Sequence, residues 1–173
     1  YAQFDRTVYQ NIPLMNKLKM FDWNTEFGNR KFDAIIGNPP YIRVQNMVHY
    51  SKEEYNFYKS NYSPYVTAQT DTLDKYYLFI EKGLALLNND GILGPHKFMN
   101  IQAGVKLREL LTSSSAVRKI LHFGTYQVFE NRSTYTCILI LTKQENTQFE
   151  IGFVQDWNQF LFNHNTECAT YPE

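Results

Sequence analysis

The stretch Phe32-Asp33-Ala34-Ile35-Ile36-Gly37-Asn38-Pro39-Pro40-Tyr41 joins a short apolar run to a rigid turn. The apolar and β-branched residues at 32–37 predict a buried β-strand. The two prolines cannot extend a sheet ladder and they restrict the backbone, so the chain turns there. The turn presents the Asn38 amide, the Pro39 carbonyl and the Tyr41 ring at the tip of the strand. These groups suit a planar amino compound such as adenine, because the oxygens accept N–H bonds and the ring stacks.

Length and charge limit the classes of protein that fit. The chain has 173 residues, enough for one domain with a sizeable core. Lys and Arg together number 17, as do Asp and Glu, so the basic excess typical of sequence-blind nucleic-acid binding is missing. Any contact with DNA must therefore be local or come from other parts of the protein.

The two cysteines, Cys137 and Cys168, are too few for a disulfide framework or a Cys-rich metal site. Cys137 lies in an apolar run and is predicted to be a core residue. The sequence contains no apolar stretch long enough to cross a membrane and no signal peptide pattern. We therefore expect a cytoplasmic protein.

Alternating strand and helix patterns predict an α/β fold with a mainly parallel sheet. Predicted helices cover 11–19, 52–60, 72–88 and 102–111, and predicted strands cover 18–21, 32–37, 92–93, 117–122, 135–142 and 149–154. The last two strands, joined by the short polar stretch 143–148, could form an antiparallel hairpin.

Local signals mark the ends of two of these helices. Ser51 is a predicted N-cap with Glu54 in the capping-box position. Asp71 and Asp74 resemble a capping pair, and the turn at 88–91 is expected to end the helix that follows them. The remainder of 42–70 is expected to be a long polar connection, a kind of loop that often carries function.

The turn at Asn38 has a specific chemical use. Methylating an exocyclic amine is difficult because the nitrogen lone pair is delocalised into the ring. Hydrogen bonds to Asn38 Oδ1 and the Pro39 carbonyl would draw the nitrogen toward tetrahedral geometry and expose the lone pair to an electrophilic methyl group. Tyr41 would stack on a base held outside the duplex. The alternative interpretation of the same residues is a plain proline turn after a strand.

The turn resembles motif IV of the N6-adenine DNA methyltransferases, and the resemblance extends along most of 18–143. It is strongest for the methyltransferase regions of type II restriction–modification enzymes that fuse cutting and methylating activities. The segments 31–43, 74–83, 90–98 and 123–141 are similar to motif IV, the motif V helix, the next strand and loop, and the motif VIII region, in that order. The resemblance implies a partial Rossmann-like fold that uses S-adenosylmethionine to methylate adenine N6 in double-stranded DNA, within a restriction–modification or phage-defence system of bacteria.

The resemblance also implies roles for individual residues of the base site. Asn38, Pro39, Pro40 and Tyr41 match the catalytic turn, and Tyr41 also matches the ring that stacks on the flipped adenine. Phe129 matches the aromatic residue that packs against the same base from another side. Its alternative is a core phenylalanine at a strand edge.

Further roles concern the cofactor and the DNA backbone. Asp22 matches the acidic residue that contacts the adenine amine of S-adenosylmethionine, and Asn38 also borders the cofactor. Arg132 and Lys97 are candidates for contacts with DNA phosphates. Each has a structural alternative, such as a turn residue or a solvated cation, and no metal site is implied.

Two features depart from the family pattern. The Gly-rich methyl-donor loop and the acidic ribose ligand have no counterpart in the sequence, and we expect both upstream of Tyr1. The chain should then be the C-terminal part of a catalytic domain over 1–155, followed by a tail at 156–173 that leads toward a recognition region, and it should bind S-adenosylmethionine poorly. Ile92-Leu93 is short for a central strand, which suggests residues missing between Gly94 and Pro95.

Two other function classes remain open. The same turn occurs in enzymes that methylate glutamine in release factors or guanine in ribosomal RNA. A non-catalytic DNA-binding domain of the same fold is the second alternative. The sequence shows no convincing carboxylate pair followed by Lys at nuclease spacing. The DNA recognition sequence and the oligomeric state cannot be inferred from these residues.

Overall fold

The computed structural model describes residues 21, 23–40, 42–61, 63–90, 104–128, 137–144, 146–156, 158, 160 and 167–172. Their elements in chain order, with η for a 3-10 helix, are α3 (Trp23–Phe27), β1 (Phe32–Ala34), η1 (Val44–His49), α4 (Lys52–Lys59), η2 (Val66–Ala68), α5 (Lys75–Leu86), β2 (Leu87–Asp90), α6 (Val105–Ser113), β3 (Val117–His122), β4 (Cys137–Leu141), β5 (Gln148–Phe153) and β6 (Glu167–Pro172).

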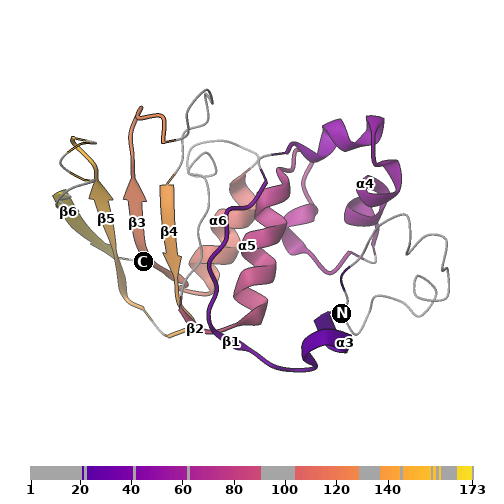
Figure 1. Cartoon of the computed structure of the whole chain (residues 1–173), viewed down its shortest axis with the longest axis horizontal. Helices are drawn as coiled ribbons and strands as arrows, with labels where there is room; N and C mark the ends of the chain where they lie inside the picture. Colours follow the sequence, from indigo (N-terminus) through magenta and orange to yellow (C-terminus); the bar gives the residue numbers. More distant parts are fainter. Residues whose placement is uncertain are drawn as a thin grey trace.

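The described strands form two sheets (Figure 1). The larger sheet has the order β4-β3-β5-β6, and β1 pairs with β2 in a separate two-stranded sheet. Pairs β1·β2 and β3·β5 are parallel, whereas β3·β4 and β5·β6 are antiparallel. The fold is therefore mixed α/β, and the prediction of a mainly parallel sheet is wrong for the part of the chain that is described.

The predicted hairpin of β4 and β5 is also wrong, because β3 lies between them. Ile120 of β3 is opposite Leu139 of β4 on one side and Ile151 of β5 on the other. The stretch that links β4 to β5 therefore crosses over a strand. The antiparallel partner of β5 is β6, which forms within the tail where no element was predicted.

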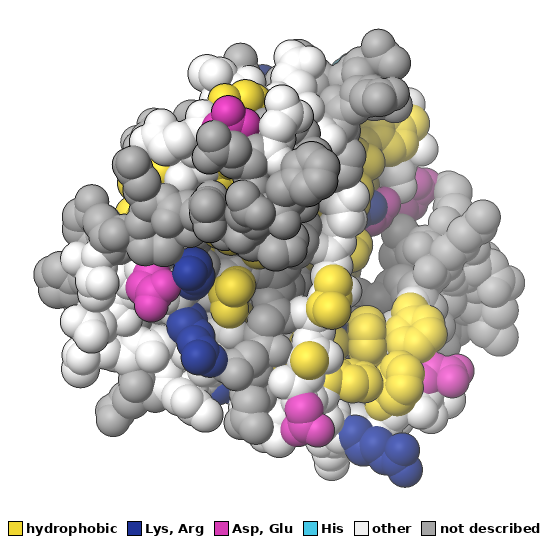
Figure 2. Space-filling model, turned by 60° about the vertical axis from the view of Figure 1, so that its left-hand side comes forward, with side chains coloured by type: hydrophobic (Ala, Val, Ile, Leu, Met, Phe, Trp, Pro, Cys, Tyr) yellow, Lys and Arg dark blue, Asp and Glu magenta, His cyan; other side chains and the backbone are white. Residues whose placement is uncertain are grey.

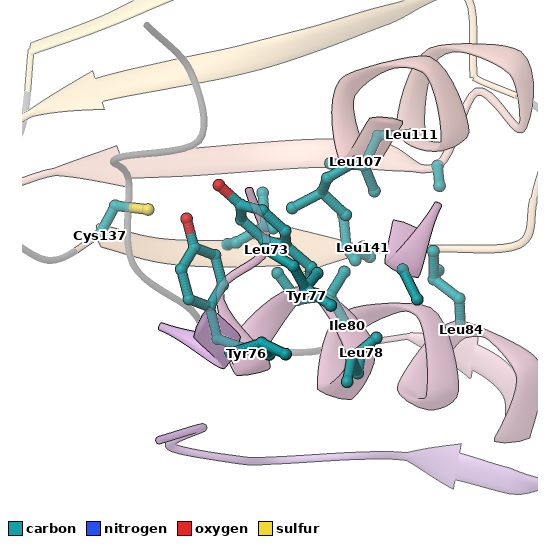
Figure 3. Packing of buried hydrophobic residues seen from close by; sticks show 14 of the residues in the cluster. Leu73, Tyr76, Tyr77, Leu78, Ile80, Leu84, Leu107, Leu111, Cys137 and Leu141 are labelled. Carbon is teal, nitrogen blue, oxygen red and sulfur yellow. The ribbon is translucent and has the colours of Figure 1, made fainter. Parts of the chain in front are cut away.

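The hydrophobic core joins α5 and α6 to the larger sheet (Figure 3). Tyr77 and Ile80 of α5, Leu107 of α6 and Leu139 of β4 are all fully buried. Strand β4 alternates buried and half-buried residues, as expected when one face of a sheet packs on helices. Cys137 at its start is buried, which confirms the prediction of a core cysteine.

Helix α5 follows the predicted helical spacing but ends earlier than predicted. Its apolar residues recur every three or four positions, and this face is the buried one. The helix stops at Leu86, and β2 begins at the next residue. The segment 88–90 was predicted to turn the chain, but it belongs to a strand. Parallel pairing with β1 overrides the low strand propensity of Asn and Asp there.

Strand β1 is shorter and more exposed than predicted. It spans only Phe32–Ala34, and no residue of the strand itself is buried. Ile36, further along the predicted strand, is 91% exposed. Among the described strands, β1 has a single neighbour, β2, so the predicted position inside a larger sheet is not observed there.

The connection after the turn is a packed unit and not an irregular polar loop. It contains η1, α4 and η2, and it buries Val44, Met47, Thr67 and Ala68 in or against the core. The apolar residues are dispersed among polar ones, so no periodic pattern reveals them in the sequence. The predicted helix at 52–60 is confirmed as α4.

The other predicted elements have different outcomes. Strands β3, β4 and β5 confirm the predictions at 117–122, 135–142 and 149–154, within the residues described. Helix α6 confirms the predicted helix at 102–111, shifted toward its C-terminal end. The predicted elements at 11–19 and 92–93, and 18–21 apart from Phe21, lie outside the described residues, and α3 was not predicted. No helix in the described ranges has the length and apolar character needed to span a membrane.

Burial raises the pKa of the Cys137 thiol to about 12. At mildly alkaline pH this thiol should therefore stay protonated and unreactive, because the thiolate is the nucleophile. We predict that a Cys168→Ser variant, which retains only Cys137, will not react with an aromatic disulfide reagent while folded. The same variant in concentrated guanidinium should release one equivalent of chromophore. Rapid labelling of the folded variant would contradict the burial of Cys137.

Candidate active site

The turn at 38–40 lies immediately beyond β1. Asn38 is exposed, Pro39 is buried and Pro40 is half-buried. The ring of Pro39 restricts its own φ torsion, and the following Pro40 restricts the ψ torsion of Pro39. Because the Pro39 ring is also buried, the backbone around its carbonyl has little freedom. The exposed Asn38 side chain therefore extends from a backbone that is held in place.

Two hydrogen bonds anchor the chain just after the turn. Val44 N donates to Leu73 O, and Lys75 N donates to Ile42 O, both at 2.8 Å. Between them, Arg43 and Asp74 form an isolated antiparallel bridge. The exit of the turn is thus joined to the start of α5, which is itself buried in the core.

The entry to the turn is anchored by the smaller sheet. Asn88 Nδ2 of β2 donates to Asp33 Oδ1 of β1 at 3.0 Å, in addition to the parallel backbone pairing. Lys31, just before β1, donates from Nζ to the Ala85 carbonyl at the end of α5. Both sides of the turn therefore depend on α5 and the strand that continues it.

Two carboxylates attach the connection at 44–73 to α5. Glu81 of α5 accepts hydrogen bonds from Val66 N at 2.7 Å, from Thr67 N at 2.9 Å and from Thr67 Oγ1 at 2.7 Å. Glu54 of α4 pairs with Lys75 Nζ at 2.6 Å and accepts from Tyr58 Oη at 2.7 Å. These contacts satisfy the N–H groups at the start of η2 and hold α4 against the first turn of α5.

The predicted helix caps occupy the expected positions with different bonding. Ser51 is the N-cap of α4, but its Oγ donates to Glu54 Oε2 at 3.3 Å and no side-chain bond to the helix backbone forms. Asp74 is the N-cap of α5, also without a side-chain bond to the backbone N–H groups. The capping-box prediction is therefore right about position and wrong about its hydrogen bonds.

The predicted site residues divide into two groups. Asn38, Pro39 and Pro40 are described and form the turn. The remaining candidates lie outside the described residues, namely Asp22, Tyr41, Lys97, Phe129 and Arg132. The junction of Gly94 and Pro95 lies outside them as well, so the hypothesis of missing residues there stays a prediction.

An aromatic cluster flanks the position of Asp22 in the chain. Trp23 of α3 lies 5.0 Å from the Phe21 ring and 5.7 Å from the Phe27 ring, and the Phe27 and Phe32 rings are 5.2 Å apart. Figure 2 shows hydrophobic side chains gathered at the lower edge of the molecule, where Figure 1 places α3. These rings join α3 to β1.

Lys82 of α5 reaches the same cluster. Its Nζ lies 5.7 Å from the centre of the Trp23 ring. Burial, together with the nearby charge of Lys31, lowers the pKa of Lys82 to about 8. An aromatic face offsets part of the cost of placing an ammonium group there.

A polar hollow of about 360 Å³ opens between α4 and η2. Its lining residues are Tyr55, Lys59, Ala68, Gln69, Thr70 and Asp71. Lys59 Nζ donates to the carbonyls of Ala68, at 3.2 Å, and of Thr70, so the lysine holds this part of the connection together. None of the lining residues belongs to the turn, and the described part of the chain contains no group of three or more His, Cys, Asp or Glu suited to a metal ion.

Most of the chain, including the turn, matches a known protein family. Residues 2–129 match the model of the Eco57I restriction-modification methylase. The chain belongs to this family. The match includes β1, the turn and α5, so the anchored segment described above lies in a methylase domain of the Eco57I family.

Curated relatives of this Eco57I-family chain are restriction–modification proteins. It is 38% identical over 136 residues to the type II restriction enzyme and methyltransferase RM.Eco57I of Escherichia coli, covering 77% of this chain and 13% of that protein. It is 34% identical over 119 residues to the type II methyltransferase M.BstVI of Geobacillus stearothermophilus, covering 67% and 20%. It is 30% identical over 125 residues to M.HincII of Haemophilus influenzae, covering 70% and 24%. The chain thus spans between 13% and 24% of the length of these three relatives.

A solved structure shares the fold. The type IIG restriction endonuclease BpuSI superposes with a TM-score of 0.54 at 13% identity, over 81% of this chain and 19% of that one. At this identity the likeness concerns the fold alone.

Several residues that organise the turn of this Eco57I-family chain escaped the sequence analysis. Glu81 and Lys75 occupy polar positions of an amphipathic helix, where most charged residues are only solvated. Glu54 was expected to cap its own helix, but it pairs with another one. Their roles depend on contacts between segments distant in sequence, which no local pattern reports.

We predict that Glu81→Ala will destabilise the protein by about 1–3 kcal/mol, because it removes three hydrogen bonds and leaves the N–H groups of η2 unpaired. Chemical denaturation followed by circular dichroism measures the change. Glu109→Ala is the matched control, since Glu109 makes an exposed pair with Lys106 on α6 and should change stability by less than about 0.5 kcal/mol. Equal effects of both substitutions would contradict the role of Glu81.

Proposed function

We propose that this chain provides the adenine-binding half of an S-adenosylmethionine-dependent DNA methyltransferase that modifies adenine N6 within a restriction–modification system. The observation that carries the proposal is the exposed Asn38 amide next to the buried Pro39, in a turn anchored on both sides. Membership of the Eco57I family supports methylation as the class of chemistry. The turn alone suits any planar amine or amide, and the resemblance of the segments 74–83 and 123–141 to the N6-adenine DNA methyltransferases favours adenine as the base.

The turn acts on the amine through hydrogen bonds. Asn38 Oδ1 and the Pro39 carbonyl oxygen accept the two N–H bonds of the adenine amine. This pairing draws the nitrogen out of conjugation and directs its lone pair away from the two acceptors. A fixed backbone matters here, because acceptors that do not have to reorganise stabilise the changing charge more effectively. After methyl transfer the nitrogen loses its extra proton to solvent, so the chain needs no strong base before attack.

The other site residues complete the proposal. Tyr41 and Phe129 hold the flipped base by stacking, which offsets part of the cost of unstacking it from the duplex. Asp22 accepts a hydrogen bond from the adenine amine of the cofactor, whose own adenine ring resembles the target base in its donor pattern. Arg132 and Lys97 contact phosphates of the DNA.

The proposal assigns only part of the cofactor site to this chain. S-adenosylmethionine supplies the electrophilic methyl group. The exposed Asn38 side chain fits a position at the border between cofactor and base. The residues of this chain do not form a complete cofactor site, because the Gly-rich loop and the acidic ribose ligand have no counterpart in its sequence. We propose that a Rossmann-like arrangement with this loop exists in the full-length protein, which works in the bacterial cytoplasm on double-stranded DNA.

Expression of the full-length protein in a host without adenine methylation tests the proposal. Sequencing that detects modified bases should reveal N6-methyladenine at one short DNA motif. Asn38→Ala should lower the methylation rate by about 100-fold or more, because one of the two acceptors is lost at the stage where charge develops. The binding of duplex DNA should change little.

Asn46→Ala is the matched control for this experiment. Asn46 is exposed in η1, eight positions after Asn38, and its backbone N donates to Arg43 O. The control variant should keep the wild-type methylation rate. Methylation of cytosine, RNA or a release factor in place of DNA adenine would overturn the proposed substrate.

A further inference from the structure

Arg43 occupies an unusual position at the exit of the turn. It is exposed, with an extended backbone at φ −67° and ψ 123°, and it is the N-cap of η1. Its neighbours face the core, since Val44 is fully buried and Ile42 packs against the core cluster. Side chains alternate along an extended backbone, so the side chain of Arg43 lies on the opposite, solvent-facing side.

The backbone of Arg43 is held firmly. Arg43 and Asp74 form the antiparallel bridge, and the two 2.8 Å hydrogen bonds of the turn exit lie directly on either side of it. Arg43 lies two positions after Tyr41 in the sequence, a span of at most about 7 Å along the chain. A long cationic side chain therefore extends from a backbone that is held in place close to the proposed base site.

The local charges favour an anion at this place. Within the described part of the chain, no carboxylate forms an ion pair with Arg43. The charged groups that the structure places near it are Asp74, across the bridge, and Lys75, whose ammonium group pairs with Glu54 at 2.6 Å. Burial raises the pKa of the Tyr77 hydroxyl, as does Asp74, while Arg108 and Arg43 lower it, so both arginines act on the same buried hydroxyl. The guanidinium group of Arg43 is therefore a cation that no carboxylate of the described residues neutralises by an ion pair.

We propose that Arg43 binds a backbone phosphate of the DNA strand that carries the target adenine. This inference rests on the proposed function. When a nucleotide is flipped out, its base leaves the stack while its flanking phosphates stay on the strand nearby. A guanidinium group is permanently charged and can form two parallel hydrogen bonds to a phosphate, so it suits this contact better than an ammonium group.

Such a contact positions the DNA and does not read its sequence. It would keep the flipped nucleotide aligned with Asn38, because Arg43 follows Asn38 by five positions and its own backbone is anchored to the start of α5. The net charge of zero makes a fixed local cation more important, because the chain as a whole does not attract DNA.

Duplex binding by the full-length protein tests the contact, using an oligonucleotide that contains the methylated motif. Arg43→Ala should raise the Kd about tenfold at moderate salt and lower the slope of log Kd against log salt by about one. Arg43→Lys should retain most of the slope. Arg30→Ala is the matched control, because Arg30 is an exposed arginine at the opposite end of β1, and it should behave as wild type.

Single methylphosphonate substitutions then locate the phosphate. Each replaces one charged oxygen by a methyl group. At one phosphate flanking the adenine, the substitution should weaken DNA binding by the wild-type protein and leave DNA binding by Arg43→Ala almost unchanged. If the effects of Arg43→Ala and of the methylphosphonate were additive at every flanking phosphate, the proposed contact would be wrong. Equal effects of Arg43→Ala and Arg30→Ala would also overturn it. In either case the proposed function would stand as long as the wild-type protein methylates adenine. A wild type that binds and methylates no duplex DNA would overturn the proposed function itself.

Discussion

The backbone pairing of Ile42 and Val44 with Leu73 and Lys75 is the constraint on which the rest of the site depends. This pairing consists of only two hydrogen bonds. It nevertheless connects the exit of the turn to a helix whose buried face enters the core, so the position of the turn depends on the stability of the core. Hydrogen bonds of this kind are modest in water, but breaking them here would also separate η1 from the core and expose Val44 and Met47. The turn is therefore fixed by packing as much as by its prolines.

Helix α5 serves both the core and the surface of the site. One side buries Tyr76 and Tyr77, whose rings meet edge to face at 4.3 Å, together with Ile80 and Leu84. The other side carries Lys75 and Glu81, which bind the connection. Because β2 begins directly after the helix and pairs with β1, the same rigid unit also supports the entry to the turn. Helix α5, with the strand that follows it, thus holds β1, the exit of the turn and η2 in place.

The sequence predicted elements well where a periodic pattern coincided with a local stop signal. Helix α4 begins after Ser51, and strand β3 spans the predicted residues, because local preferences and burial agree there. The predictions failed where a distant partner decides the outcome. The Asn-rich end of α5 pairs with β1 in spite of its turn-like composition, and β3 separates two strands that are sequence neighbours. In the candidate site, the position of the turn at 38–40 after a strand was predictable from its prolines, and the acceptor role of Asn38 and Pro39 stays a prediction from their residue types. The supporting contacts of Glu54 and Glu81 were not predictable, since they join separate segments.

The balance of charges bears on the proposed contact between a polyanion and this neutral chain. Several of its carboxylates are used inside the protein: Glu81 binds the N–H groups of η2, Glu54 pairs with Lys75, and Glu150 pairs with Lys119 across β3 and β5. A carboxylate that is bound in this way contributes less negative potential at a distance than a free one. Two of these carboxylates neutralise a lysine each, whereas Glu81 is bound by uncharged N–H and O–H donors, so the formal count of zero does not describe how charge is distributed over the faces. For a nearby phosphate, the field within about 10 Å of the turn matters most, and the charged residues that the structure places next to its exit are Arg43, Asp74 and the paired Lys75 and Glu54. Under the proposed function, a local cation of this kind would attract DNA at the place where the turn can also reach a base, and so would favour productive contacts over binding elsewhere on the surface.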